Sequence, residues 1–224
     1  MKTLIILLST FLFIGCGSSS TNKKNNSATT ITQTSTSEIS TELKNTLSYM
    51  GNEERLAYDI YLRLYQEYPI TQFYNIAMNS ETKHIQEVQK LVNTYVDSYD
   101  EFTNTDLNEL AYKDTSVSNM ESGVYDIQKI QELYDNLIAL GLQSELDALK
   151  VGCMVEVVDI NDLLEYIELA EKENATEVVS SFELLRDGSY KHYWAFDSAL
   201  TSRGYVQGCC IAGDEYCHPE YPNN

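Results

Sequence analysis

The sequence predicts an all-α domain, a four-helix bundle with a long crossover between the second and third long helices. Three observations indicate this fold. Proline is confined to positions 69, 219 and 222, so nothing breaks a helix within residues 70–218. Four long segments carry apolar residues at helical spacing. A polar and irregular stretch, residues 97–125, follows the second of these segments and predicts the crossover.

The first two long helices are expected at 43–67 and at about 71–95. Pro69 ends the first of them. The apolar stripe of the first helix contains Leu47, Met50, Ala57, Ile60, Tyr61 and Leu64, and that of the second contains Phe73, Ile76, Ala77, His84, Val88 and Leu91. Because His84 falls on the second stripe, the pattern predicts an imidazole inside the bundle.

The remaining helices follow the crossover. A shorter helix is expected within residues 126–142, closed by Gly141. The third long helix begins near Ser144 and continues to about residue 173, and the fourth runs from about Thr176 to Ser202. We therefore place one helical domain at 43–205, long enough for a sizeable core, and a cysteine-containing tail at 206–224.

The N-terminal residues predict export and a lipid anchor. In residues 1–15, Lys2 precedes an apolar run of signal-peptide length. The run ends in "FIGC" (13–16), which resembles the lipobox of bacterial lipoproteins, although Phe13 stands where leucine is usual. Residues 16–42 are mostly Ser, Thr, Asn and Lys and predict a flexible tether. We expect a protein anchored to the bacterial cell envelope through a lipid on Cys16.

The charge of the chain narrows the choice of partners. It has 34 acidic and 15 basic residues and a formal net charge of −19. Nucleic acid and anionic lipid surfaces are therefore poor partners. Metal cations are partners that this charge favours, and the anchored lipid is the expected contact with a membrane. The oligomeric state is left open.

Four cysteines remain once Cys16 is lipidated, namely Cys153, Cys209, Cys210 and Cys217. An even number in an exported protein suggests disulfides, and three pairings are possible. The alternative is a zinc site in the tail, where three thiolates and His218 lie close in sequence. Two adjacent cysteines are poorly placed to bind the same ion, so we predict disulfides and not a zinc site.

The strongest chemical signal is a set of polar residues on the apolar faces of the long helices. Glu81 and His84, three residues apart in "NSETKHIQEV" (79–88), form a pair that recurs in di-iron carboxylate proteins. A solvated helix face is the alternative for this pair. Glu156 and Asp159 share the apolar stripe of the third helix, where two carboxylates repel unless they are protonated or share a cation.

The first and fourth helices add one inward group each. Glu54 faces the core and is preferred to Glu53, because Glu54 aligns with Tyr61. His192 aligns with Ser189 on the apolar face of the fourth helix. The complete candidate set of ligands is Glu54, Glu81, His84, Glu156, Asp159 and His192. Four carboxylates and two imidazoles match the charge of two divalent ions.

Four segments together resemble the ferritin-like superfamily, and most closely the bacterial and archaeal family catalogued as domain of unknown function 2202. These are "EERLAYDIY" (53–61), "FYNIAMNSETKHIQEV" (73–88), "ALKVGCMVEVVDINDL" (148–163) and "GSYKHYWAF" (188–196). The resemblance implies a di-iron site with glutamate on the first helix, E-x-x-H on the second, glutamate on the third and E-x-x-H on the fourth. Glu54, Glu81 with His84, Glu156 and His192 match these positions.

The chain departs from that pattern on the fourth helix, where Ser189 stands in place of glutamate. We expect Asp159 either to supply the missing carboxylate or to orient a histidine from outside the ligand set. Tyr61 is a candidate to hydrogen-bond a ligand carboxylate, with core packing as its alternative role.

The resemblance implies a surface-tethered metalloprotein that binds one or two iron ions, or another divalent metal, and oxidises Fe(II) with oxygen or peroxide. The alternative is a non-enzymatic binding or scaffold protein that keeps the bundle with at most a structural ion, because a fold alone does not establish an activity.

Overall fold

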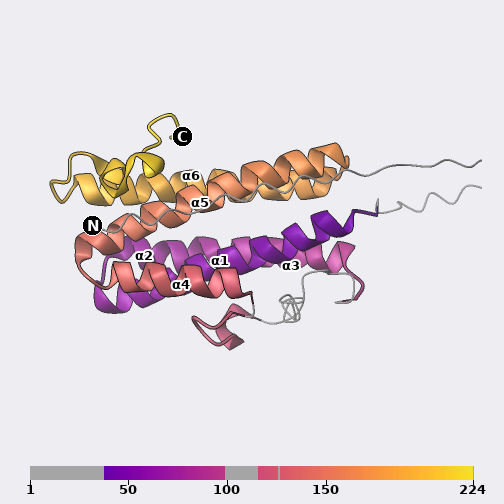
Figure 1. The fold of residues 1–224 in the computed structure, drawn as a ribbon, viewed down its shortest axis with the longest axis horizontal. Coiled ribbons are helices and arrows are strands. Elements are labelled where there is room, and N and C mark those ends of the chain that lie inside the picture. The colour runs from indigo at the N-terminus through magenta and orange to yellow at the C-terminus, as the bar shows by residue number, and fades with distance from the viewer. Residues whose placement is uncertain (1–37, 99–115, 126, 224) are drawn as a thin grey trace, which may run out of the picture. The chain divides into compact units, whose positions relative to one another are not determined.

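The computed structural model describes residues 38–98, 116–125 and 127–223. Within these residues all regular structure is helical, which confirms the predicted class (Figure 1). The expected signal peptide, the lipidated Cys16 and most of the expected tether lie outside them. No helix among the described residues is long and apolar enough to cross a membrane.

Helix α1 spans Thr41–Glu67, so it begins two residues before the predicted start. Its N-cap is Ser40, whose side chain accepts a hydrogen bond from the Leu43 amide and satisfies one of the free donors of the first turn. The helix ends just before Pro69, which lacks the amide hydrogen that a continuing helix needs.

The second long segment is continuous but not uniformly α-helical. Helix α2 (Thr71–Ile76) passes into a π-helical turn (Ala77–Glu81), which passes into α3 (Thr82–Tyr95). Sequence analysis predicted one regular helix over this range. The π-turn adds a residue to one turn of the helix, and this shifts the face that the following residues present.

The end of the crossover is fixed to α1 through Asp59. The buried Asp59 carboxylate accepts hydrogen bonds from the Ser122 hydroxyl at 3.0 Å, the Gly123 amide at 3.0 Å and the Tyr125 hydroxyl at 2.7 Å. The short helix α4 (Gln128–Gly141) follows, near its predicted position. Asp59 therefore has a structural role that accounts for its burial without a metal.

Helices α5 (Glu145–Lys172) and α6 (Thr176–Thr201) form a hairpin. The side chain of Ser144 caps α5 by accepting from the Asp147 amide. The connecting turn contains Asn174 at φ 57°, a left-handed conformation that asparagine tolerates better than most residues. In Figure 1, α5 and α6 lie side by side above α1 and α3, which are also packed together.

The core consists of two apolar clusters. One lies around Tyr61, Phe73 and Phe196, and the other around Leu47, Leu91 and Phe182. On α1, α5 and α6, the residues between the two clusters include Glu54, Asp159 and His192, and Glu81, His84 and Glu156 lie among the last residues of the first cluster on their segments. A polar layer therefore crosses the core between two apolar ones.

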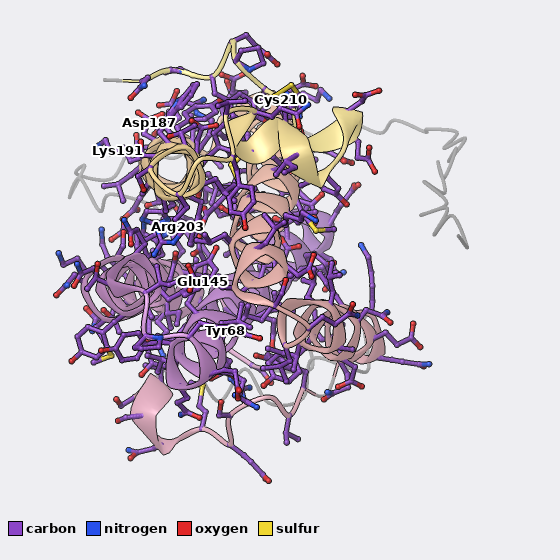
Figure 2. The ribbon with its side chains drawn as sticks, turned by 90° about the vertical axis from the view of Figure 1, so that its left-hand side faces the viewer. Tyr68, Glu145, Asp187, Lys191, Arg203 and Cys210 are labelled. Carbon is purple, nitrogen blue, oxygen red and sulfur yellow. A yellow bond between two sulfur atoms is a disulfide. The ribbon has the colours of Figure 1, made fainter. Side chains whose placement is uncertain are left out.

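Two disulfides hold the tail. Cys153 on α5 pairs with Cys209, and Cys210 pairs with Cys217, so all four sulfurs are used and no thiolate remains for a zinc site. Cys209 and Cys210 lie in a short 3-10 turn at Gly208–Ala212, and Cys217 directly follows a second one at Asp214–Tyr216. Figure 2 shows Cys210 in this segment, and also Arg203, whose side chain donates to Glu145 at 2.6 Å and ties the end of α6 to the start of α5.

Candidate metal centre

The π-turn places the central carboxylate of the polar layer. In this turn Met78 and Asn79 are exposed and Ala77 and Glu81 are buried. His84, three residues beyond Glu81, is also buried. A single π-turn within an α-helix is a feature that occurs often at functional sites. Here it delivers a glutamate and a histidine to the same point of the core.

The first group of potential ligands joins α1 to the π-turn and α3. His84 Nδ1 lies 3.0 Å from Glu54 Oε2 and 3.1 Å from Glu81 Oε2. All three residues are at least 96% buried. One ligand atom from each lies within 4.8 Å of the others, so one cation between them would contact two carboxylates and one imidazole.

The second group joins the π-turn to α5 and α6. His192 Nδ1 lies 3.1 Å from Glu81 Oε1 and 3.4 Å from Glu156 Oε2. These three residues are also buried, and their ligand atoms meet the same 4.8 Å limit. The imidazole rings of His84 and His192 are 5.5 Å apart at an angle of 26°.

Glu81 belongs to both groups. Its Oε2 faces His84 and its Oε1 faces His192, so the two groups share one carboxylate. Both histidines present Nδ1 to the carboxylates. A carboxylate that offers one oxygen to each of two cation positions is the arrangement found where two metals act together. Glu81 would therefore offer one oxygen to a divalent cation held with Glu54 and His84, and the other to one held with Glu156 and His192.

Two further side chains contact these groups from outside. The Tyr61 hydroxyl donates to Glu156 Oε1. The Ser80 hydroxyl lies 2.8 Å from His192 Nε2 and 3.5 Å from His84 Nε2, so it touches the outer nitrogen of both rings. Hydrogen bonds of this kind fix the tautomer and the orientation of metal-binding histidines. Ser80 is absent from the candidate residues predicted from the sequence, although it stands four residues before His84 on the same helix face.

Asp159 lies near the centre but belongs to neither group. Its Oδ2 accepts a hydrogen bond from Ser189, and its Oδ1 is buried without a partner. The serine that replaces the expected glutamate on α6 therefore contacts the aspartate that we expected to compensate for it. The structure shows no hydrogen bond from Asp159 to either histidine among the described residues.

Buried carboxylates crowd around two imidazoles in this centre, and their charges shift one another's pKa values. Burial alone would raise the pKa of Glu81, but the neighbouring imidazoles of His192 and His84 lower it below its usual range. Burial, and to a smaller degree the charge of Asp159, raise the pKa of Glu54 well above its usual value. Burial and the charge of Glu156 raise the pKa of Asp159 to about 8.

The histidines carry the compensating charge. Burial alone would lower the pKa of His192, but Glu156 and Glu81 raise it to about 10. In the same way Glu54 and Glu81 raise the pKa of His84 well above its usual value. A metal ion that binds the Nδ1 atoms of these histidines would release their protons.

Unsatisfied polar atoms give an independent test of whether a metal fits. Glu54 Oε1 and Asp159 Oδ1 are buried and have no hydrogen-bond partner, and His192 Nδ1 has only its charge contacts with Glu81 and Glu156. Most buried polar atoms in proteins are hydrogen-bonded, so several orphans around one point need an explanation. Carboxylates and imidazoles are ligands that suit iron, manganese and zinc. The residues present therefore fit a transition-metal centre.

Gly188 on α6 provides space for the first group. A Cβ atom at this position would lie 2.5 Å from His84 Nε2, which is closer than side chains approach one another. Glycine costs helix stability relative to alanine, so its presence in the middle of α6 needs a packing reason. The imidazole of His84 is that reason.

Comparison with known proteins identifies the family of the chain. A model of the family described as "Uncharacterized protein domain (DUF2202)" matches residues 43–214, which include every candidate ligand. The uncharacterised protein MJ0754 of Methanocaldococcus jannaschii is 36% identical over 166 residues, 74% of this chain and 79% of that protein. The crystal structure of hypothetical protein MJ0754 from Methanococcus jannaschii matches with a TM-score of 0.61 and 34% identity, covering 79% of this chain and 87% of that one. This chain therefore belongs to the DUF2202 family.

Proposed function

We propose that this protein is an exported, lipid-anchored, ferritin-like metalloprotein that holds two iron ions and oxidises Fe(II) with oxygen or peroxide. The observation that carries the proposal is the position of Glu81, whose two oxygens face His84 and His192 separately. This sharing turns two three-residue groups into one centre with two cation positions. The localisation rests on the sequence of residues 1–16 alone.

Different residues would bind the two metal ions, orient their ligands and exclude water. Glu54, Glu81 and His84 would hold one iron, and Glu81, Glu156 and His192 the other. When bound, two iron ions supply one electron each to an oxygen molecule or a peroxide. Glu81 keeps the two positions adjacent, Tyr61 orients Glu156, and the apolar clusters on both sides keep bulk water away.

A ferritin-like bundle is the architecture we propose for the domain. Its support is the packing of α1 against α3 and of α5 against α6, with α1 also in contact with α5. The candidate ligands come from all four long segments of this arrangement, at the centre of the core. Bundle cores of this kind are a recurrent place for carboxylate-bridged metals.

The competing proposal is a binding or scaffold protein with at most one structural ion. It is favoured by the departure on α6, where Ser189 replaces a carboxylate and leaves Asp159 outside both ligand groups. With fewer acids around the cations, a two-metal site has less negative charge to hold them. Metal content separates the two proposals.

The test is anaerobic loading of the purified protein with Fe(II), followed by metal analysis and then exposure to oxygen. We expect about two irons per chain and oxygen uptake faster than in buffer with the same iron. His84→Ala should remove both results. His218→Ala is the matched control, because His218 lies in the tail and hydrogen-bonds Glu220. A single ion that oxygen does not change, or no bound divalent metal at all, would support the scaffold and overturn the di-iron proposal.

A further inference from the structure

We propose that Asp162, Glu53 and Asp159 form an uptake route through which a hydrated divalent cation reaches the buried centre from the surface. The proposal rests on the proposed metal centre and adds a second cation-binding feature to it. Its starting point is a requirement of the site, because the ligands of both groups are at least 94% buried. A charged ion does not cross an apolar layer without compensating groups.

The register of α1 against α5 brings the two outer acids together. The rings of Tyr49 and Tyr166 lie 6.4 Å apart, and further along Tyr61 reaches Glu156, so the two helices run antiparallel. Moving four residues from each outer tyrosine toward the centre, on the same helix face, gives Glu53 and Asp162. The two side chains also interact, since both the charge of Asp162 and its hydrogen bond with Glu53 raise the pKa of Glu53.

Asp159 continues the series inward. It precedes Asp162 by three residues and follows Glu156 by three, so α5 presents an acid on one face at each successive turn. The charge of Asp159 acts on Glu53 and on Glu54. Half-buried Asp162 is the outer end of this series and the two ligand groups are its inner end.

Two orphaned atoms point to a cation in this series. Glu53 is 5% exposed and its Oε2 has no hydrogen-bond partner, and Asp159 Oδ1 is buried and unpartnered too. A buried carboxylate oxygen without a donor is costly unless a cation or a proton compensates it. Glu53 lies outside both three-ligand groups found among the described residues. The pair with Asp162 therefore suits a hydrated cation in passage better than a resident one.

A lysine stands at the mouth of the route. The Lys129 ammonium lies 4.7 Å from the centre of the Tyr49 ring, and its positive charge acts on Glu53. Lys129 is exposed, so it can move away. An incoming divalent cation would compete with this ammonium for the same carboxylates. Removing the lysine should therefore speed up metal uptake, whereas removing either acid should slow it.

The experiment follows the rate at which the protein takes up Co(II), mixed rapidly and read by the absorption of the bound ion. Asp162→Asn and Glu53→Gln should each slow uptake about tenfold, the lower end of electrostatic effects on association. The final stoichiometry and the dissociation constant should stay at the wild-type values. Lys129→Gln should accelerate uptake. The matched control is Glu168→Gln, which removes the same charge from an exposed site on α5.

The outcomes separate the route from the centre. A wild-type protein that binds Co(II), with both acid variants loading at its rate, overturns the route and leaves the centre standing. Variants that lose stoichiometry instead of rate would make Glu53 or Asp162 resident ligands and would also overturn the route. A wild-type protein that takes up no Co(II) overturns the proposed centre and the route with it. Because Asp162 is half-buried, Asp162→Asn keeps the test valid even where Glu53→Gln fails to fold.

Discussion

The two halves of the centre share Glu81 but differ in what holds their other carboxylate. Glu156 accepts a hydrogen bond from Tyr61 on one oxygen and faces His192 with the other. Glu54 faces His84 at 3.0 Å with one oxygen, and its second oxygen has no partner. Ser80 is likewise closer to His192 than to His84, at 2.8 Å against 3.5 Å.

The two halves therefore differ in how far their ligands are oriented before a metal binds. Hydrogen bonds from Tyr61 and Ser80 orient the Glu156 half before a metal arrives, so less order is lost on binding. The Glu54 half instead contains a carboxylate oxygen without a partner, so it gains more from a cation. We expect the Glu156 half to bind first and the Glu54 half to depend on it through Glu81.

Removal of the shared carboxylate should have the largest effect. Glu81→Ala is expected to abolish both cation positions, whereas His84→Ala should leave the Glu156 half. A metal that binds only the folded protein stabilises it by about 2.7 kcal/mol at a hundredfold excess over its dissociation constant. Melting temperatures with and without Zn(II) should show no metal-induced rise for Glu81→Ala and a partial rise for His84→Ala. Equal rises in the two variants would show that Glu81 is not shared.

The helical class and the burial of the candidate ligands could be predicted from the sequence because both depend on periodicity. The spacing of apolar residues placed the helices and turned Glu54, His84, Glu156 and His192 inward. The family predicted from the four quoted segments was confirmed. The helical class was confirmed as well, since the described residues contain no strand.

The rest was not predictable, because it depends on local departures from an ideal helix and on long-range contacts. The π-turn follows no rule of spacing, and a serine four residues before His84 carries no signal in the sequence that it contacts two imidazoles. Glu53 was ranked below Glu54 on alignment, yet it is buried too, because α1 has packing partners on more than one side. The cysteine pairing required the path of the tail across α5 and α6.

A larger side chain at Gly188 on α6 should abolish metal binding at the Glu54 half only. Gly188→Ala places a Cβ where His84 Nε2 now lies, so the imidazole must move away from Glu54 and Glu81. Overpacking of this kind costs about 1–3 kcal/mol of folding free energy. Metal analysis should give one ion per chain instead of two. Asp187→Ala, an exposed neighbour on the same helix, should keep two, and loss of both ions in Gly188→Ala would contradict independent halves.

Loss of the Ser80 hydroxyl should weaken metal binding at both halves, and more strongly at the half that contains His192. Loss of such an outer contact typically weakens metal binding about 10- to 100-fold. We therefore expect Ser80→Ala to weaken both steps of a Zn(II) titration by calorimetry, with Ser80→Thr restoring them. Thr82→Ala, which removes an exposed hydroxyl two residues away, is the control. Weakening confined to the His84 step would show that the shorter Ser80 contact has no role.

The metal-free protein should lose stability as pH rises from 5 to 8. Asp159, with its pKa raised to about 8, keeps a proton in the folded state that the unfolded chain has already released. Folding is then favoured at low pH, with a slope of at most about 1.4 kcal/mol per pH unit for each such proton. His192, with its pKa raised to about 10, adds the same sign above pH 6.5. Urea unfolding in chelator should show a shallower slope for Asp159→Asn, and an unchanged slope would exclude Asp159 as its source.

The smallest effect is expected from Tyr61→Phe, which removes one donor from the better prepared half. The ring packs between Phe73 and Phe196, and phenylalanine keeps that packing, so the domain should fold normally. Loss of one hydrogen bond corresponds to about 1 kcal/mol, or about fivefold in affinity. Because Tyr61 contacts Glu156 and not Glu54, the loss should appear in the tighter step of a Zn(II) titration and bring the two steps closer together. Steps that move apart instead would mean that the Glu54 half binds first, and would reverse the order that we infer for the two halves.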